Sequence, residues 1–444
     1  MRILVVSYEF SPSISPRAIR WTAIVNEWVR QGILVDVVCA RPIGEHLTPQ
    51  QQDGVRIYRT GELGIQALRS RMRTRDSAPS SGDRAPGTFL GTWILAAIRW
   101  LYARTWRPIL WPDYACLWYL PARRAAMRLA RAQRYDALVT VSHPFTSHWI
   151  GLSLKRRFKS LRWLADSGDP FAFLISPAVN NHRLYARLNY VVERRVFTRA
   201  DALTVTTEAT RARYEELFPE CGKKLAVLPP LLAESDDCQL QTEPRPADGR
   251  LRLVYVGTLY RTIRNPVPLL VLFERMRNTS IGDRLDLHFY GDVHDCGAWF
   301  DEYRERLGST LHVHGIVSHQ AALSAMHDAD VLVNLGNDTP YQLPSKVVEY
   351  LATGRPVLNI ARRADDSSAA FFGQYENALC LFDGSREWSN ADVERAVEFV
   401  ATAAGTKGGS ERQLIECFRA SRIAAGYLRL LQEEDAAARP ENPP

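Results

Sequence analysis

The chain has 444 residues, of which 46% are hydrophobic and 24% charged, and its formal net charge is +7. Its length exceeds one ordinary domain and fits two domains of about 200 residues each, with the composition of a soluble globular protein. No run of about twenty apolar residues occurs, so no membrane-spanning helix is expected. The seven cysteines are scattered without metal-ligand or redox spacing, which favours a reducing, cytoplasmic setting.

Charge is divided unevenly along the chain. Residues 1–240 contain 34 Lys and Arg but only 21 Asp and Glu, whereas the remainder has an excess of acidic residues. A basic first half predicts an anionic partner: a membrane leaflet, a lipid diphosphate or nucleic acid. Nucleic acid is disfavoured because no recognition motif is present and the second half is acidic.

The first elements predict a doubly wound α/β domain. A strand at 2–7 is followed by a loop, a helix over 17–31 and a second strand at 35–39. The loop reads Ser-Ile-Ser-Pro-Arg where a dinucleotide-binding fold has its glycine-rich turn, so that fingerprint is absent. Arg17 and Arg20 lie at the start of the predicted helix.

The next region combines a polar loop with a tryptophan-rich segment. Residues 69–87 have the composition of a flexible loop. Residues 89–120 hold five tryptophans interspersed with arginines, namely Trp93, Trp100, Trp106, Trp111 and Trp118. This mixture suits the headgroup level of a membrane. A bulky core rimmed by surface arginines is the alternative interpretation.

Polar side chains follow two predicted strands of the first domain. His143 comes after the strand at 137–141, and Asp166 and Asp169 come after the strand at 161–165. Ligands of open α/β sheets bind outside the carboxyl ends of the strands. Asp169 or Asp166 could therefore orient a hydroxyl group of a ligand or accept its proton, unless the Asp-Pro sequence only forms a turn.

A second α/β series follows. After strands at 202–206 and 225–228, the chain has the composition of a linker. The later predicted strands are 251–257, 285–291, 311–315, 331–335 and 356–360. Asp328 and Asp330 precede a buried strand, where aspartate commonly marks a turn, and no metal site is predicted.

The most specific pattern is the stretch 343–358. Pro344 suits the first turn of a helix, Ser345 can cap it and Gly354 ends it. A polar loop after an apolar strand thus leads into a helix N-terminus, where unpaired N–H groups favour an anion. Lys346 adds a positive charge there, and Glu349 lies one turn further along.

This stretch resembles the retaining GT-B glycosyltransferases of the family 4 type, in the branch that assembles bacterial polysaccharides. The resemblance implies two doubly wound Rossmann-like domains facing across a cleft, and a helix that binds a nucleotide sugar. Family members carry two acidic residues eight positions apart; the second, which contacts ribose, maps onto Glu349. The first, which contacts the donor sugar, maps onto Tyr341, so the pair is incomplete.

The resemblance also implies roles for other residues. Lys346, the N–H groups near Ser345, and Arg261 or Arg264 after the strand ending at Gly257 would neutralise the leaving diphosphate. His143 would face the donor sugar. Arg17 or Arg20 would contact the acceptor, with a solvated helix arginine as the alternative.

The resulting hypothesis is a metal-independent, retaining hexosyltransferase of cell-surface polysaccharide biosynthesis. It would act in the cytoplasm, at the inner membrane face, on a nucleotide-diphosphate sugar as co-substrate and a lipid-linked or saccharide acceptor. The alternatives are a catalytically silent scaffold of the same fold and a nucleotide-sugar epimerase. The expected parts are an acceptor domain (1–230), a linker (231–250), a donor domain (251–410), a helix crossing back (411–434) and a disordered tail (435–444).

Overall fold

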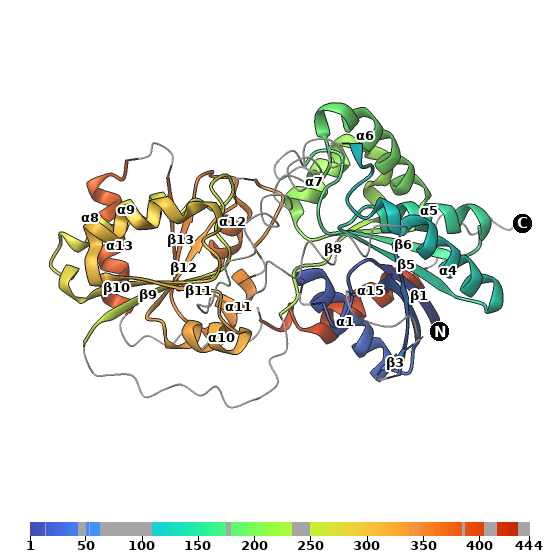
Figure 1. Ribbon diagram of the computed structural model, residues 1–444, viewed down its shortest axis with the longest axis horizontal. Coiled ribbons are helices and arrows are strands. Elements are labelled where there is room, and N and C mark those ends of the chain that lie inside the picture. Colours follow the sequence, from blue (N-terminus) through green and yellow to red (C-terminus); the bar gives the residue numbers. More distant parts are fainter. Residues whose placement is uncertain are drawn as a thin grey trace, which may run out of the picture. The chain divides into compact units, whose positions relative to one another are not determined.

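The computed structural model describes residues 1–13, 15–42, 50–52, 54–62, 109–174, 179–232, 249–337, 339–344, 346–383, 387–403 and 415–433. The chain divides into two compact units (Figure 1). Unit 1 comprises Met1–Leu228 together with Ile423–Pro444, and unit 2 comprises Pro229–Arg422. The last helix therefore belongs mainly to the first unit.

Unit 1 is built on an eight-stranded sheet in the order β3-β4-β2-β1-β5-β6-β7-β8. All its strand pairs are parallel except β3 with β4. The strands are β1 (Arg2–Ser7), β2 (Leu34–Ala40), β3 (Gln50–Gln52), β4 (Val55–Thr60), β5 (Ala137–Ser142), β6 (Arg162–Ser167), β7 (Ala202–Val205) and β8 (Leu225–Val227). Every residue of β5 is buried, as expected for a parallel strand covered on both faces.

Helices pack on both faces of this sheet (Figure 1). They are α1 (Pro16–Arg30), α4 (Tyr119–Ala132), α5 (Thr146–Arg157), α6 (His182–Arg199), α7 (Glu208–Leu217) and α15 (Ala420–Gln432). Ser15 caps α1 by accepting a hydrogen bond from the Ala18 N–H, and Pro16 occupies its first turn. The connection from β1 through α1 to β2 is thus the one that the sequence predicts.

The C-terminal helix α15 is held to unit 1 by one buried carboxylate. Asp166, which is 1% exposed, accepts hydrogen bonds from Tyr427 of α15 (2.8 Å), Thr204 of β7 (2.8 Å) and Trp21 of α1 (3.0 Å). Arg20 of α1 donates to the Tyr427 hydroxyl at 3.1 Å. A buried charge is stable only when it is paired and hydrogen-bonded, so these groups must assemble together.

Backbone contacts complete the attachment of α15. Trp28 of α1 donates its indole N–H to the Ala424 carbonyl at 3.0 Å, and Arg162 of β6 donates to the Leu430 carbonyl at 3.0 Å. A Cβ at Gly426 would come within 2.9 Å of the Leu228 side chain. The glycine therefore lets the helix approach the end of the first unit closely.

Unit 2 contains a six-stranded, wholly parallel sheet in the order β11-β10-β9-β12-β13-β14. Its strands are β9 (Leu251–Val256), β10 (Leu285–Tyr290), β11 (Leu311–Gly315), β12 (Val331–Leu335), β13 (Val357–Ala361) and β14 (Ala378–Phe382). Its helices are α8 (Val267–Arg277), α9 (Gly297–Leu307), α10 (His319–Asp328), α11 (Lys346–Thr353), α12 (Ser367–Phe372) and α13 (Asn390–Ala403).

One predicted boundary differs from the structure. β6 continues through Ser167, so Asp166 lies within the strand and not beyond its end. The final helix α15 covers Ala420–Gln432, and the predicted start of the last helix at 411 lies outside the described residues. The loop at 69–87, the tail at 435–444 and the tryptophans at 93, 100 and 106 lie outside the described residues. Within the described ranges, no helix has the length and apolar character needed to cross a bilayer.

Replacing Tyr427 by Phe tests the attachment of α15. The change removes the donor to Asp166 and the acceptor of Arg20, so the free energy of unfolding should fall by about 1–3 kcal/mol in urea titrations. Tyr190→Phe is the matched control, because its hydroxyl bonds weakly at the surface (3.4 Å to the Leu217 carbonyl). Equal stability of the Tyr427→Phe variant and the wild type would contradict this role.

Candidate functional site

The two sheets each have a position where the order of strands reverses. In unit 1 it lies between β1 and β5, and in unit 2 between β9 and β12. Ligands of open α/β sheets bind outside the carboxyl ends of strands at such positions. β9 and β12 pair only through Leu253 with Val331 and Val254 with Leu332, so their carboxyl ends are not joined by ladder hydrogen bonds.

Tyr350 of α11 satisfies the backbone at this reversal in unit 2. Its hydroxyl accepts a hydrogen bond from the Val256 N–H at 2.8 Å, and the side chain is 1% exposed. Burial raises the pKa of this phenol, so it stays neutral. Tyr350 thus ties α11 to the end of β9 and fixes where the first turn of that helix lies.

The first turn of α11 contains an ion pair. The Lys346 ammonium lies 2.6 Å from the Glu349 carboxylate, and the two side chains are 27% and 14% exposed. Both predicted residues therefore lie together, and each is the partner of the other. Ser345, predicted to cap the helix, lies outside the described residues.

Arg264 joins the loops that follow β9 and β12. Its Nε donates to Asn337 Oδ1 at 3.0 Å, and Asn337, which is 3% exposed, donates to the Gln342 carbonyl at 2.7 Å. The backbones of Tyr260 and Arg264 bond to each other across the intervening turn. Arg264 is thus held at the carboxyl ends of both strands, and Asn337 fixes the loop that carries Tyr341. No feature of the sequence singled out Asn337.

Arg261, in contrast, is engaged by a different part of unit 2. Its guanidinium lies 4.7 Å from the centre of the Trp299 ring, and its Nε donates to the Asp295 carbonyl at 2.8 Å. Its backbone N–H donates to the Asp295 side chain. The two arginines that the sequence treats as equivalent are therefore held by different partners, and only Arg264 is bonded to the loop after β12.

In unit 1, Arg17 lies over Gly168 beside the carboxyl end of β6. A Cβ at Gly168 would overlap the Arg17 guanidinium, at 0.9 Å from Nη2. Arg17 Nη1 lies 3.5 Å from Asp166, and the side chain is 15% exposed. Glycine at position 168 therefore makes room for this arginine between the first turn of α1 and the loop after β6.

Arg20 and Asp166 do not fit the roles that the sequence predicts for them. Arg20 is 5% exposed and donates to Tyr427 and to the Leu228 carbonyl, so it faces the interior and not an acceptor. Asp166 is enclosed by its hydrogen-bond donors and has no open path to an acceptor hydroxyl. The error arose because the strand was predicted to end before Asp166.

Asp169 and His143 are the more accessible of the predicted polar residues. Both are half-buried and lie in the loops after β6 and β5. The His143 ring lies 5.4 Å from the Tyr114 ring. The loop after Asp169 is fixed by Glu193, whose carboxylate accepts from the Phe171 and Ala172 N–H groups. Burial raises the pKa of Glu193 to about 7.

Under the same loops lies a fully buried histidine that the sequence analysis missed. Trp163 donates to the Thr140 hydroxyl, which can then donate its own hydrogen to His148 Nδ1 at 2.7 Å. His148 Nε2 lies 3.3 Å from the Ser167 hydroxyl. Burial lowers the pKa of His148 to about 3, so the ring is neutral and supports the end of β6.

The surface of unit 1 has a groove between α4 and α5. Its volume is about 720 Å³, and its lining contains no acidic residue. The basic lining residues are Arg123, Arg124, Arg128, Arg131, Arg156 and Arg157. We call this feature the arginine groove. Six guanidinium groups around one depression create a strong attraction for anions.

Comparison with solved structures identifies the architecture. Sucrose-phosphate synthase from Thermosynechococcus elongatus superimposes with a TM-score of 0.65 at 17% identity, over 98% of this chain and 100% of the other. An E. coli trehalose-6-phosphate protein bound with UDP-2-fluoro glucose gives 0.64 at 12% identity, over 98% and 100%. WaaG, a glycosyltransferase involved in lipopolysaccharide biosynthesis, gives 0.51 at 13% identity, over 98% and 96%.

No protein-family model matches the sequence, and no curated protein matches it. At these low identities the structural matches establish the fold alone. Both doubly wound sheets are present, and the matches extend over nearly the whole chain. The predicted fold class is therefore confirmed: the chain has the GT-B fold.

The neutral state of His148 predicts a pH effect on stability. Below pH 6.5 the unfolded chain binds a proton at His148, whereas the folded protein binds it only near pH 3. The neutral ring therefore contributes to the free energy of unfolding in full above pH 6.5, and this contribution is lost as the pH falls toward 3. In urea titrations, His148→Gln should reduce the loss of unfolding free energy by about 1.4 kcal/mol per pH unit within that window. The exposed His319→Gln variant should behave as the wild type; an unchanged slope in His148→Gln would refute the assignment.

Proposed function

We propose that the protein transfers a hexose from a nucleotide-diphosphate sugar to a saccharide or lipid-linked acceptor. The observation that carries this proposal is the pair of cationic groups at the strand reversal of unit 2. Lys346 begins α11, which Tyr350 ties to β9, and Arg264 is bonded to the loop after β12. The GT-B fold supports the proposal, because two of the matching structures, one from Rickettsia africae and WaaG, are described as glycosyltransferases.

The chemistry requires the departing diphosphate to be neutralised. The Lys346 ammonium would leave Glu349 for the phosphate oxygens, with Arg264 in support, whereas the Val347 N–H already donates to the Pro344 carbonyl at 3.2 Å. Glu349 would then accept hydrogen bonds from the ribose hydroxyls. Preformed positive groups of this kind stabilise the charge that develops in the transition state. Arg261 is a weaker candidate, because it is engaged by Trp299 and Asp295.

Unit 1 would supply the acceptor side. Arg17 beside Gly168 would contact the acceptor, and Asp169 would orient its hydroxyl or take its proton. His143 would face the donor sugar. Retention of anomeric configuration, metal independence and a place in cell-surface polysaccharide synthesis follow from the resemblance to family 4-type enzymes.

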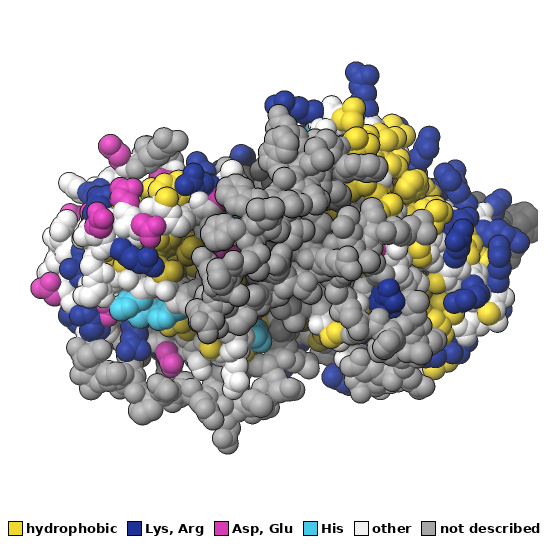
Figure 2. Space-filling model, in the orientation of Figure 1, with side chains coloured by type: hydrophobic (Ala, Val, Ile, Leu, Met, Phe, Trp, Pro, Cys, Tyr) yellow, Lys and Arg dark blue, Asp and Glu magenta, His cyan; other side chains and the backbone are white. Residues whose placement is uncertain are grey.

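A membrane surface is the proposed location of a lipid-linked acceptor. The arginine groove lies between α4 and α5, and α6 packs beside α5. α6 exposes Leu184 (63%) and Leu188 (42%) to solvent. Figure 2 shows basic and hydrophobic side chains together on this part of unit 1. Exposed aliphatic groups flanked by arginines suit the headgroup region of an anionic bilayer.

Two alternatives make different predictions. Tyr341 in place of an acidic residue favours a catalytically silent scaffold, which would neither consume a sugar donor nor release a nucleoside diphosphate. An epimerase of the same fold would convert a nucleotide sugar without any acceptor. Incubation with nucleotide sugars, with and without saccharide acceptors, followed by mass spectrometry separates these outcomes.

Lys346→Ala tests the donor site. Loss of one charge-assisted contact of about 1.5–3 kcal/mol should weaken binding of a nucleoside diphosphate by about tenfold to a hundredfold. Isothermal titration with UDP, GDP and ADP measures this. Lys223→Ala, at an exposed lysine of unit 1, is the control and should bind as the wild type. Unchanged affinity of the Lys346→Ala variant would remove the helix α11 site from the proposal.

Replacing Arg128 and Arg131 together by Glu tests the membrane surface. The wild type should cosediment with vesicles that contain anionic lipid and not with zwitterionic vesicles, with the bound fraction falling as salt rises. The double variant should lose this binding. The double variant of Arg304 and Arg395 to Glu, at exposed arginines of unit 2, should retain it. Equal binding of both variants would contradict the proposed surface.

A further inference from the structure

Two adjacent strands of unit 2 carry a repeated pattern of metal-ligating residues. β10 contains Asp286-Leu-His288, and the edge strand β11 contains His312-Val-His314. Alternate residues of a strand lie on the same face, and the parallel register aligns His288 with His312. Strand alternation and register therefore bring these residues together, although no single short motif marks them.

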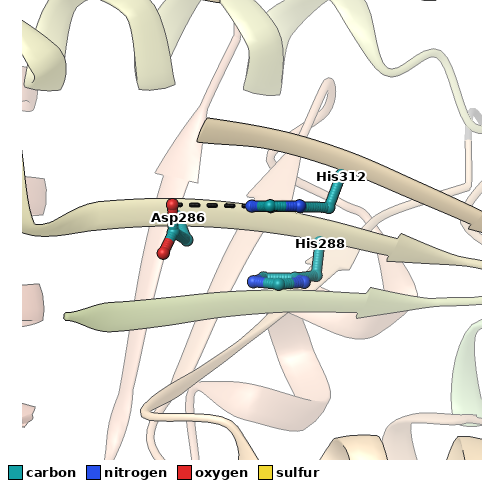
Figure 3. A group of neighbouring side chains, drawn as sticks. All are labelled: Asp286, His288 and His312. Atoms are coloured by element: carbon teal, nitrogen blue, oxygen red, sulfur yellow. Dashed lines mark ion pairs between the residues drawn. The ribbon is translucent and has the colours of Figure 1, made fainter. Parts of the chain in front are cut away.

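The side chains converge at the surface of the sheet. Asp286, His288 and His312 each offer one ligand atom, and these atoms all lie within 4.8 Å of one another. Asp286 Oδ1 lies 3.6 Å from His312 Nε2 (Figure 3). The rings of His288 and His312 are stacked 4.3 Å apart at an angle of 9°. Figure 2 shows histidine side chains gathered in an exposed strip on unit 2.

One ring nitrogen of this cluster lacks a hydrogen-bond partner. Among the described residues, His288 Nε2 is buried and has no donor or acceptor within reach. The other nitrogen, Nδ1, lies 3.0 Å from His314 Nε2. If His288 Nδ1 carries the hydrogen and donates it to His314, then Nε2 is unprotonated and its lone pair accepts no hydrogen bond. Metal-bound histidines commonly donate their second N–H in this way, which fixes the tautomer.

Positively charged side chains next to the cluster compete with an ion for the carboxylate. Arg250 forms a two-pronged ion pair with Asp286. Arg252 faces His288 with a further positive charge. An ion at this site would therefore share the Asp286 carboxylate with Arg250.

We infer that Asp286, His288 and His312 form a binding site for a divalent transition-metal ion, for which Zn²⁺ is the best candidate. Two imidazole nitrogens and one carboxylate oxygen form a donor set that Zn²⁺ accepts readily, with water completing the coordination. His314 acts as the positioning residue for His288. The ion would fasten the edge strand β11 to β10, apart from the residues proposed for sugar transfer.

Binding requires a small rearrangement of the two rings. A metal lies near the plane of each imidazole that coordinates it, whereas the rings of His288 and His312 are parallel. They must therefore tilt toward a common point by rotation about their terminal torsions. That torsion is broad in histidine, and His312 lies on an edge strand with its side chain 38% exposed, so most of the rotation falls to His312, while His288 stays bonded to His314.

The test uses the whole chain and Zn²⁺ alone as the probe. Purified protein is stripped with EDTA, dialysed against Zn²⁺ and analysed for bound metal by mass spectrometry, with titration calorimetry for the affinity. The wild type should bind one ion through this site and show a higher melting temperature with Zn²⁺ than with EDTA. Co²⁺ in place of Zn²⁺ should give the visible absorption of a low-coordinate complex.

His312→Gln and His288→Gln should each weaken Zn²⁺ binding at least tenfold and abolish the thermal shift. His319→Gln, at an exposed histidine of the same unit, is the matched control and should bind as the wild type. Circular dichroism verifies that each variant is folded. Because His312 lies on an edge strand, its substitution should disturb folding less than that of His288. Absence of zinc binding by the wild type, or binding that both cluster variants retain, would overturn the inference.

Discussion

The buried Asp166 carboxylate is the interaction on which the first unit depends. Its donors come from α1, β7 and α15, which are far apart in the sequence. Because an unpaired charge in the interior is very costly, these elements form one cooperative assembly. Arg17 Nη1 lies 3.5 Å from the same carboxylate. The C-terminal helix therefore helps to determine where the proposed acceptor arginine lies, even though it carries no residue proposed for chemistry.

In the second unit, the neutral phenol of Tyr350 holds separate elements together. Tyr350 occupies the position where β9 and β12 cease to pair and satisfies a backbone N–H that no strand reaches. This contact places the first turn of α11, with Lys346 and Glu349, at the strand reversal. The Lys346–Glu349 pair keeps both charges satisfied until a ligand arrives. A diphosphate and a ribose present complementary partners for this pair, which is why the proposed donor site needs both residues.

Residues that look equivalent in the sequence differ once their partners are known. Arg17 and Arg20 are three positions apart on α1, yet one lies beside Gly168 and the other is buried against Tyr427. Arg261 and Arg264 diverge in the same way, toward Trp299 and toward Asn337. No local pattern marks the histidines of β10 and β11, because their proximity depends on strand register and not on spacing within one segment.

The sequence by itself determined the two doubly wound sheets, the order of their elements and the helix between β12 and β13, which was predicted to start at Pro344 and is observed over Lys346–Thr353. Those features follow from apolar periodicity, turn residues and helix caps, which act between neighbours in the chain. Only the tertiary structure decided which of several polar residues are buried, which are paired and which are accessible. Burial and pairing depend on groups hundreds of positions away, as with Tyr427 on Asp166, and no local pattern encodes such contacts.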